Sequence, residues 1–451
     1  MTPAERRQMM LSGPIVPTIL ALSAPNVLNV AMQSLVSIGD AFFVGQLGIV
    51  DLAALALVFP AQMALGQMSA GAMGGGISSS VARALGSGNR AGAEAAAAHG
   101  LAIAVGMAAL FAIAFAGFGR IIFGALGGSG GALDRAEAFA NVLFLGCLAH
   151  WIANSMASVL RGTGDMKTPG YALVAAAALQ IPLCGALTLG WAGLPRLGIQ
   201  GPAASAVICF ALAALWMLFR LIGPHATLQL RLPVGGFRWR SFSDILKVGL
   251  IACLVVILTN GTVLLVTGLI GRAGDGAIAG YGIGSRLEYM LVPISFGIGA
   301  ALTALVGTNI GARQHARALR MAWSGAFMAG GIAALIGVVV AIWPDLWLGL
   351  FTHHPGALAS GRIYLHTVGP VYGFFGLAMA LYFASQGTGE MIWPVMANLT
   401  RIVIAVCGSL LALDVLGWGL PGLFAFVALG IVSFATVLAF STTRPAWRGT
   451  T

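Results

Sequence analysis

The sequence predicts an all-α integral membrane protein with twelve transmembrane helices, in two six-helix lobes related by a pseudo-two-fold axis along the membrane normal. Three observations lead to this fold class. The composition is too apolar for a water-soluble chain, the apolar runs are long and continuous, and the second half of the chain repeats phrases of the first.

The composition indicates an integral membrane protein. Of its 451 residues, 59% are hydrophobic and only 8% are charged, a balance typical of membrane proteins. Hydrocarbon offers backbone amides no hydrogen-bond partner, so a span must be a helix or part of a closed barrel, and a barrel strand would alternate apolar and polar residues. The apolar runs here do not alternate, and we therefore expect helices.

About twenty apolar residues cross a bilayer. When the sequence is divided at Gly, Pro and charged residues, twelve candidate spans result: 15–43, 51–79, 95–118, 136–160, 170–191, 199–220, 244–270, 277–305, 318–343, 360–386, 392–414 and 419–441. The first is too long and too interrupted by proline for a cleaved signal peptide, so we expect it to stay in the mature protein.

The basic residues predict the orientation of these spans. With both termini in the cytoplasm, sixteen of the 23 Lys and Arg residues lie on the cytoplasmic side and five on the outer side. Short cytoplasmic loops collect Lys and Arg. The distribution therefore predicts cytoplasmic termini, and attraction to the inner leaflet accounts for the net charge of +10 without a nucleic-acid partner.

Cysteine and histidine patterns predict neither a disulfide nor a metal site. The five cysteines stand singly within spans without CxxC spacing, and no histidine belongs to an HExxH motif. We expect no metal and no cofactor.

An internal repeat predicts two lobes. "RGTGDMKTP" (161–169) and "SQGTGEMIWP" (385–394) share Gly-Thr-Gly-acid followed by proline, and their first glycines, Gly162 and Gly387, are 225 positions apart. Six spans per half return the chain to its starting side, so the halves are parallel repeats. We expect each motif to end a helix, with glycine permitting the turn before proline restarts the next one.

The repeat also sets the domain boundaries. We expect an N-terminal lobe over residues 1–220 and a C-terminal lobe over 244–451, joined by a cytoplasmic linker at 221–243 that is rich in basic residues, proline and glycine. A cleft between two lobes of one chain needs no second subunit. A functional monomer is therefore expected.

Acids within spans are the main functional candidates, because hydrocarbon makes ionisable groups costly. Of thirteen acidic residues, eleven fall in loops or at helix ends, which leaves Asp40 and Glu288. One face of the first span carries polar residues at helical spacing, namely Asn26, Asn29, Gln33, Ser37 and Asp40. Hydrogen bonds between helices would explain the amides and the hydroxyl. They explain a carboxylate poorly, and we interpret Asp40 as the ion-coupling acid.

Glu288 is the second ion-coupling candidate. Arg286 is two residues away, and side chains at that spacing do not face each other on a helix, so neither is presumed to neutralise the other. A structural ion pair and an interfacial position are the alternatives for Glu288. Eight residues are candidates to line a cavity or contact the substrate. They are Asn26, Asn29, Gln33 and Ser37 on the polar face of the first span, and Gln180, Asn260, Tyr281 and Arg286 from their positions in the spans.

Four phrases, "DAFFVGQLGIVDLAALAL", "LRGTGDMKTP", "GIQGPAASAV" and "GYGIGSRLE", give the chain a family resemblance over residues 14–440. Together they resemble the multidrug and toxic compound extrusion (MATE) family. The resemblance implies export of organic cations by alternating access of two lobes, driven by inward flow of protons or sodium. It also implies that Asp40 is the family's cation- or proton-responsive aspartate.

Two features of the chain modify that expectation. Many relatives have Asn and Asp in the fifth helix, where this chain has Gln180 and Cys184. In addition, residues 250–267 and 364–386 contain none of the acids that form the family's site in the C-terminal lobe. Fewer hard anionic oxygens favour protons over sodium as the coupling ion. Pro25 removes a backbone hydrogen bond from the first span, and we expect this helix to bend there.

Two alternatives stay open. A flippase for lipid-linked oligosaccharides, of the same wider superfamily, would favour several basic residues facing the cavity, and only Arg286 and Arg401 lie in spans. An intramembrane enzyme would need a nucleophile and base, such as GxSxG with His, or a metal cluster, and neither pattern occurs.

The alanine- and glycine-rich composition and a single-chain exporter suggest a bacterial inner membrane.

Overall fold

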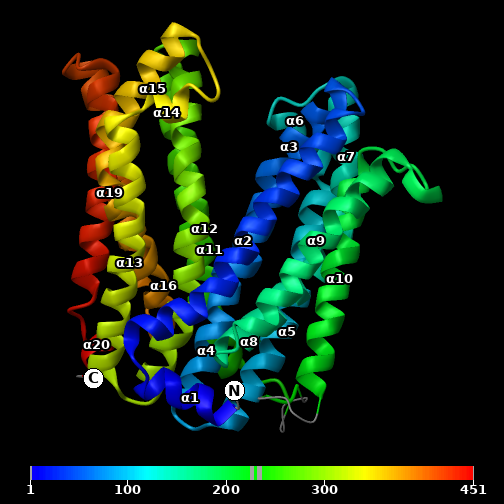
Figure 1. Ribbon diagram of the computed structural model, residues 1–451, viewed down its shortest axis with the longest axis vertical. Coiled ribbons are helices and arrows are strands. Elements are labelled where there is room, and N and C mark those ends of the chain that lie inside the picture. Colours follow the sequence, from blue (N-terminus) through cyan, green and yellow to red (C-terminus); the bar gives the residue numbers. More distant parts are fainter. Residues whose placement is uncertain (1–2, 224–227, 231–235, 450–451) are drawn as a thin grey trace. The chain divides into compact units, whose positions relative to one another are not determined.

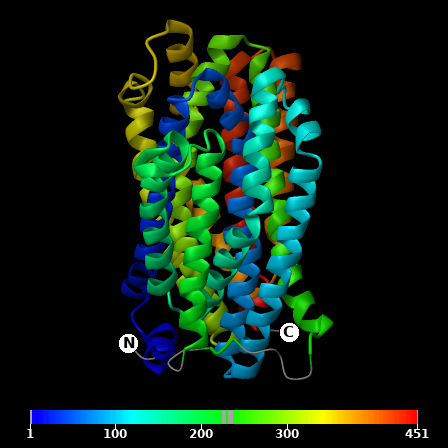
Figure 2. The same cartoon turned by 90° about the vertical axis from the view of Figure 1, so that its right-hand side faces the viewer.

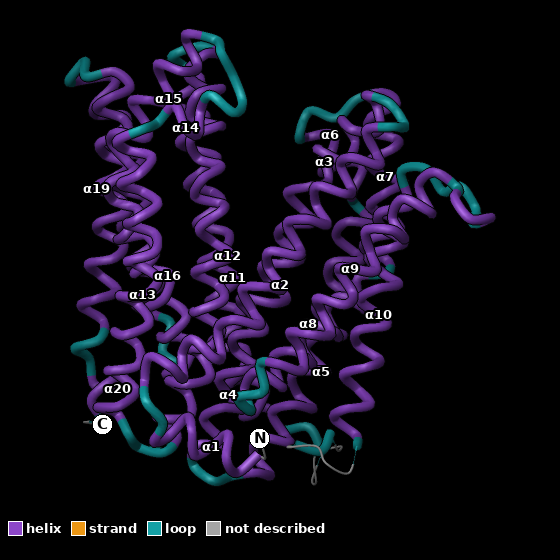
Figure 3. Tube along the Cα trace, viewed as in Figure 1, coloured by secondary structure: helices purple, strands orange, loops and turns teal. Residues whose placement is uncertain are grey.

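The computed structural model describes residues 3–223, 228–230 and 236–449. Every regular element in these ranges is a helix (Figures 1 and 3), which confirms the predicted all-α class. The predicted linker at 221–243 lies partly outside the described residues.

The first half of the chain forms a series of long helices (Figure 1). Short π or 3-10 segments divide several of them. In order they are α1 (Pro3–Ser12), α2 (Ile15–Gly45), α3 (Ile49–Gly66), η1 (Gln67–Met73), α4 (Gly74–Gly86), α5 (Arg90–Ala112), η2 (Ile113–Gly117), α6 (Gly119–Ala125), α7 (Gly130–Leu145), α8 (Cys147–Gly162), α9 (Lys167–Leu189), η3 (Trp191–Gly193) and α10 (Gln200–Ile222).

The second half repeats this pattern and begins with three long uninterrupted helices. In order they are α11 (Trp239–Gly271), α12 (Asp275–Gly311), α13 (His315–Ile342), α14 (Asp345–Leu348), α15 (Pro355–Val368), η4 (Gly369–Val371), α16 (Tyr372–Thr388), α17 (Ile392–Ile402), η5 (Val403–Cys407), α18 (Gly408–Leu410), η6 (Leu411–Val415), α19 (Gly419–Ser441) and α20 (Pro445–Arg448).

The twelve predicted spans each have a counterpart. Within the described residues, eleven helical segments are long and apolar enough to cross a membrane, and α7 with α8, bent by 46°, makes the twelfth. The bend lies at Gly146, where an added Cβ would stand 2.4 Å from Cγ2 of Val207 on α10. Close approach of α10 at a residue without a side chain therefore accompanies this break, which the sequence did not predict.

The chain divides into two compact units of packed helices. Unit 1 comprises residues 1–8 and 24–249, and unit 2 comprises 9–23 and 250–451. The boundaries at Ala24 and Leu250 are 226 positions apart, close to the repeat spacing. Within each unit the long helices run side by side (Figure 2).

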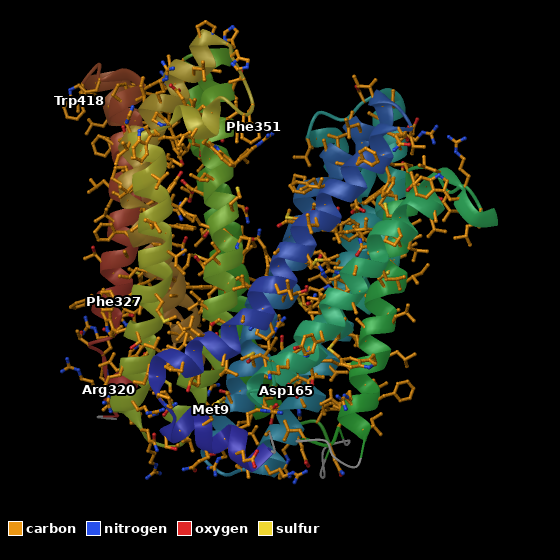
Figure 4. All side chains as sticks on the ribbon, in the orientation of Figure 1. Met9, Asp165, Arg320, Phe327, Phe351 and Trp418 are labelled. Atoms are coloured by element: carbon orange, nitrogen blue, oxygen red, sulfur yellow. The ribbon has the colours of Figure 1, made fainter. Side chains whose placement is uncertain are left out.

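Within unit 2 the loops between spans gather at two ends. Phe351 and Trp418 lie at one end and Met9 and Arg320 at the other (Figure 4). The core of this unit contains a buried cluster of mostly aliphatic residues, in which Tyr281, Tyr364 and Phe424 are also packed.

The first glycine of the repeated Gly-Thr-Gly motif lies at a close contact between helices in both units. An added Cβ on Gly162 would lie 2.7 Å from the carbonyl oxygen of Ser78 on α4, and one on Gly387 would lie 2.8 Å from that of Thr303 on α12. Ser78 and Thr303 are themselves 225 positions apart. The first glycine thus allows two helices to approach closely at equivalent places.

The second glycine of each motif ends the helix. Gly164 has φ 79° and Gly389 has φ 87°, a left-handed backbone that favours glycine. Their amides donate to the carbonyl oxygens of Arg161 and Gln386. The expected helix ends are confirmed at both places.

We predict that Gly387→Ala lowers the stability of the protein by about 1–3 kcal/mol, because the added methyl group overpacks the contact between α16 and α12. Gly331→Ala on α13 is the matched control, since no atom lies within 4 Å of its added Cβ. Thermal unfolding in detergent measures both. Equal melting temperatures of the two variants would contradict the close-packing role of the motif.

Candidate functional site

Asp40 lies on α2 in unit 1 and is almost completely buried, with 5% exposure. Its carboxylate is within hydrogen-bonding reach of the Cys184 thiol on α9. Oδ1 is buried without a hydrogen-bond partner, and no ion pair among the described residues includes Asp40. The carboxylate is therefore held against a neutral, weakly donating group rather than against a cation.

The polar neighbours of Cys184 are also neutral groups. Its sulfur lies 3.8 Å from Oγ1 of Thr188, one turn further along α9, and within hydrogen-bonding reach of Ser205 on α10. Thr188 and Ser205 are both fully buried. An added Cβ on Gly201 of α10 would stand 2.4 Å from Oγ1 of Thr188, so tight packing of α9 on α10 holds these groups in place.

The polar face predicted for the first span is turned mainly inward. Asn26 is fully buried, with Nδ2 at 3.5 Å from the sulfur of Met166, and Asn29 is 7% exposed. Gln33 and Ser37 are half-buried. Gln180, one turn before Cys184 on α9, is buried as well.

Pro25 lies inside α2, which continues through it from Ile15 to Gly45. The proline packs against α9: an added Cβ on Gly170 would stand 2.7 Å from Cβ of Pro25. The helix that carries Asp40 therefore lacks one backbone donor at Pro25, and at the same residue it packs closely against Gly170.

Glu288 has a different environment in unit 2. Its carboxylate accepts a hydrogen bond from the hydroxyl group of Tyr364 on α15, and Tyr364 is fully buried. Arg401 on α17, with 5% exposure, is close enough to attract the carboxylate electrostatically. Glu288 thus has both a donor and a compensating charge, unlike Asp40.

Tyrosine rings complete the surroundings of Glu288. Tyr281 meets Tyr364 edge-on, with ring centroids 5.3 Å apart, and stacks on Phe424 at 6.2 Å. Tyr372 on α16 is also fully buried and lies close enough to interact electrostatically with Glu288. Of the predicted cavity-lining residues in this unit, Tyr281 is the one that joins this cluster.

Two other predicted residues lie apart from it. Arg286 is exposed, with its guanidinium 5.9 Å from the ring centroid of Phe351. None of the ion pairs among the described residues joins Arg286 to Glu288, in line with their spacing. Asn260 is exposed on α11, where its Nδ2 donates to the carbonyl oxygen of Val256. Within the described part of the chain, no group of three or more His, Cys, Asp or Glu is placed to hold a metal ion.

Sequence reasoning named Cys184 and Arg401 but did not pair them with the two acids. It missed the neighbouring Thr188, Ser205, Tyr364 and Tyr372, although helical spacing offered a partial signal. Gln180, Cys184 and Thr188 follow at steps of four on α9, and Tyr281 precedes Glu288 by seven, so each set lies on one helix face. Nothing in a single sequence, however, pairs a face of α2 with a face of α9.

A family model described as MatE matches the chain twice, over residues 25–185 and 252–411. The chain belongs to the MATE family. Each half of the chain contains one match, in agreement with the internal repeat and the two units. The protein is therefore a multi-pass membrane protein of a multidrug efflux transporter family, and transport rather than catalysis is the activity that its relatives support.

Bacterial relatives are similar over nearly the whole MATE chain. The "FAD transporter" of Shewanella oneidensis is 24% identical over 401 residues, which cover 88% of each chain. The "Probable multidrug resistance protein NorM" of Deinococcus radiodurans is 25% identical over 437 residues, or 95% of this chain and 90% of the relative. Their names therefore span two classes of cargo.

Solved structures share the MATE fold. A transporter of the MOP superfamily from Pyrococcus furiosus superposes with a TM-score of 0.90 at 22% identity and covers 98% of both chains. The outward-facing conformation of a multidrug resistance MATE family transporter superposes with a TM-score of 0.86 at 23% identity, covering 96% of both chains. At these identities the likeness shows the fold alone.

Proposed function

We propose that this MATE protein is a secondary active exporter of organic cations, in which inward flow of protons through Asp40 drives efflux by alternating access. The observation that carries the proposal is the environment of Asp40, a buried carboxylate with a thiol neighbour and no ion-pair partner among the described residues. A buried carboxylate without a fixed positive partner favours binding of a mobile positive charge. A proton and an organic cation can both supply that charge.

Competition at one carboxylate produces antiport. Ionised Asp40 attracts a cationic substrate into an apolar surrounding. A proton arriving from outside neutralises the carboxylate, removes that attraction and releases the substrate. Because each ligand weakens the binding of the other, their coupling is reciprocal. Cys184, Thr188 and Ser205 stay neutral throughout and leave the charge change to Asp40.

Protons remain favoured over sodium in this proposal. Sodium would need several hard oxygen ligands around the carboxylate, whereas the neighbour that Asp40 contacts is the sulfur of Cys184. In unit 2 Glu288 is already compensated by Arg401 and Tyr364. We therefore assign Glu288 a supporting role in holding the helices of unit 2, rather than a second coupling site.

The proposal also includes the topology and the membrane. We place both termini in the cytoplasm of a bacterial cell, with the spans in its inner membrane and a single chain as the functional unit. The distribution of Lys and Arg supports the orientation, and the bacterial relatives support the setting.

An anionic cargo is the second candidate, and the Shewanella relative named "FAD transporter" favours it. A dinucleotide carries negative phosphates and would seek a cation. Arg401 is the buried cation of unit 2 described above, but it lies beside Glu288, which offsets its charge. Asp40 would repel such a cargo, so the proposal keeps organic cations as the substrate class.

Transport by reconstituted protein tests the proposal. Proteoliposomes preloaded with ethidium or with FAD are given an imposed proton gradient or, separately, a sodium gradient. Ethidium efflux driven by the proton gradient alone is the expected result. Efflux driven only by sodium would reject the coupling ion, transport of FAD alone would reject the substrate class, and release of labelled lipid-linked oligosaccharide would favour a flippase.

We further propose that α2 bends at Pro25 when Asp40 changes its protonation state. The Pro25→Ala variant restores the backbone donor, so we expect slower ethidium transport with proton binding at Asp40 unchanged. Efflux assays and proton-binding measurements on the same preparation separate the two effects. Full transport by Pro25→Ala would remove the bend from the mechanism while leaving Asp40 in place.

A further inference from the structure

A groove of about 690 Å³ opens in unit 1, and Asp40 is not among the residues that line it. Its walls are the last turns of α4, the first turns of α5 and the first turns of α11. The side chains that determine its charge and its position are Ser80, Arg83, Trp239, Arg240, Asp244 and Lys247. The Asp40 site does not use this groove.

One wall of the groove is held rigidly. Asp244 on α11 receives two hydrogen bonds from Nη2 of Arg83, at 2.9 and 3.1 Å, and one from Oγ of Ser80 at 2.7 Å. Nearby, an added Cβ on Gly76 of α4 would stand 2.8 Å from the carbonyl oxygen of Ile245. The start of α11 is therefore fixed against α4, and the charge of Asp244 is already matched by Arg83.

Two positive charges remain in the groove. Arg240, Asp244 and Lys247 follow at steps of four and three and so share one face of α11. Arg240 and Lys247 are exposed, and none of the ion pairs among the described residues contains either. Asp244 already pairs with Arg83 at 2.9 Å, which offsets its charge. The groove thus carries an excess of two positive charges.

The groove lies at the level of a membrane surface. The candidate span that contains α4 ends at Gly86, and the one formed by α11 begins at Trp239, so their adjoining ends meet the headgroup region. Trp239 itself is 76% exposed, as expected of a ring at a membrane interface. Basic pockets between transmembrane helices at this level suit anionic lipid headgroups.

We propose that this groove binds the headgroup phosphate of an anionic phospholipid, with Arg240 and Lys247 as the residues that hold it. Lipid is favoured over a soluble anion because the groove opens between span ends, where lipid headgroups are concentrated and an interfacial tryptophan stands beside the two cations. In the proposed topology this is the inner leaflet, whose anionic lipids match the charge of the groove.

Binding of a fluorescent short-chain phosphatidylglycerol to the purified protein, followed by fluorescence anisotropy, tests the site. The variant carrying Arg240→Gln and Lys247→Gln is expected to raise the dissociation constant about thirty-fold, since each lost cation near a membrane surface contributes about a factor of five. The matched control carries Arg220→Gln and Arg238→Gln, which remove two exposed arginines of unit 1 that do not line the groove. We expect less than about a threefold change for the control.

Unlabelled competitors identify the source of the phosphate. Short-chain phosphatidylglycerol is expected to displace the probe, whereas phosphatidylcholine and inorganic phosphate at the same concentration leave it bound. Equal weakening by both double variants would overturn the site in favour of diffuse surface charge. Displacement by inorganic phosphate would overturn the lipid as occupant, and displacement by phosphatidylcholine would overturn the selectivity for anionic headgroups. Size-exclusion profiles and melting temperatures of the variants confirm that each is folded.

Discussion

Asp40→Asn is expected to abolish proton-driven ethidium efflux, so that the remaining leak equals that of protein-free liposomes. The amide keeps the size and hydrogen-bonding capacity of the side chain, yet it can neither release a proton nor attract a cation. Because Asp40 is buried beside the neutral Cys184, no other acid described near it can take over its charge. Efflux from proteoliposomes with an imposed proton gradient measures the effect.

Asp51→Asn is the matched control for this variant. Asp51 is a nearly buried aspartate of the same unit, but it lies in the first turn of α3 and pairs with Arg135 at 3.6 Å. Its loss should leave efflux close to that of the wild type. Continued pumping by Asp40→Asn, or an equal loss in both variants, would show that coupling does not depend on the Asp40 carboxylate.

Glu288→Leu is expected to destabilise unit 2 by about 3 kcal/mol, since it leaves two buried groups without their partner. The Tyr364 hydroxyl would lose its acceptor and Arg401 its attracting carboxylate. Thermal unfolding of the purified protein in detergent measures the loss. Glu288→Gln, which keeps an acceptor for Tyr364, should recover part of the stability.

A double-mutant cycle isolates the contribution of Arg401. If the carboxylate compensates the arginine, Glu288→Leu costs less stability in an Arg401→Leu background than in the wild type. Proton-driven efflux by folded Glu288→Gln should persist, because the proposal places coupling at Asp40. Loss of coupling in Glu288→Gln without loss of stability would instead make Glu288 a transport residue.

The spans and the repeat could be predicted because both are local properties of the sequence. Hydropathy over a window of about twenty residues reports a span regardless of its neighbours. The Gly-Thr-Gly motif contains its own structural reason, because Gly164 and Gly389 take the left-handed backbone that ends a helix. Such features depend little on which helices pack together.

Contacts between helices could not be predicted in this way. The bend at Gly146 depends on Val207, sixty-one residues later on α10, and the surroundings of Asp40 depend on Cys184. Glu288 finds its hydrogen-bond donor at Tyr364 on another helix. Periodicity identifies the inward face of each helix but not the face that it meets. The two acids were therefore predictable as candidates, while the difference between their environments was not.

In the proposed mechanism one carboxylate binds either a proton or a cationic substrate. The most direct test measures protons released when ethidium is added to purified protein in weakly buffered solution, at a pH where Asp40 is protonated without substrate. We predict release of protons by the wild type and none by Asp40→Asn, with Asp51→Asn behaving as the wild type. Equal release by the wild type and Asp40→Asn, or binding of ethidium without any release, would contradict the mechanism.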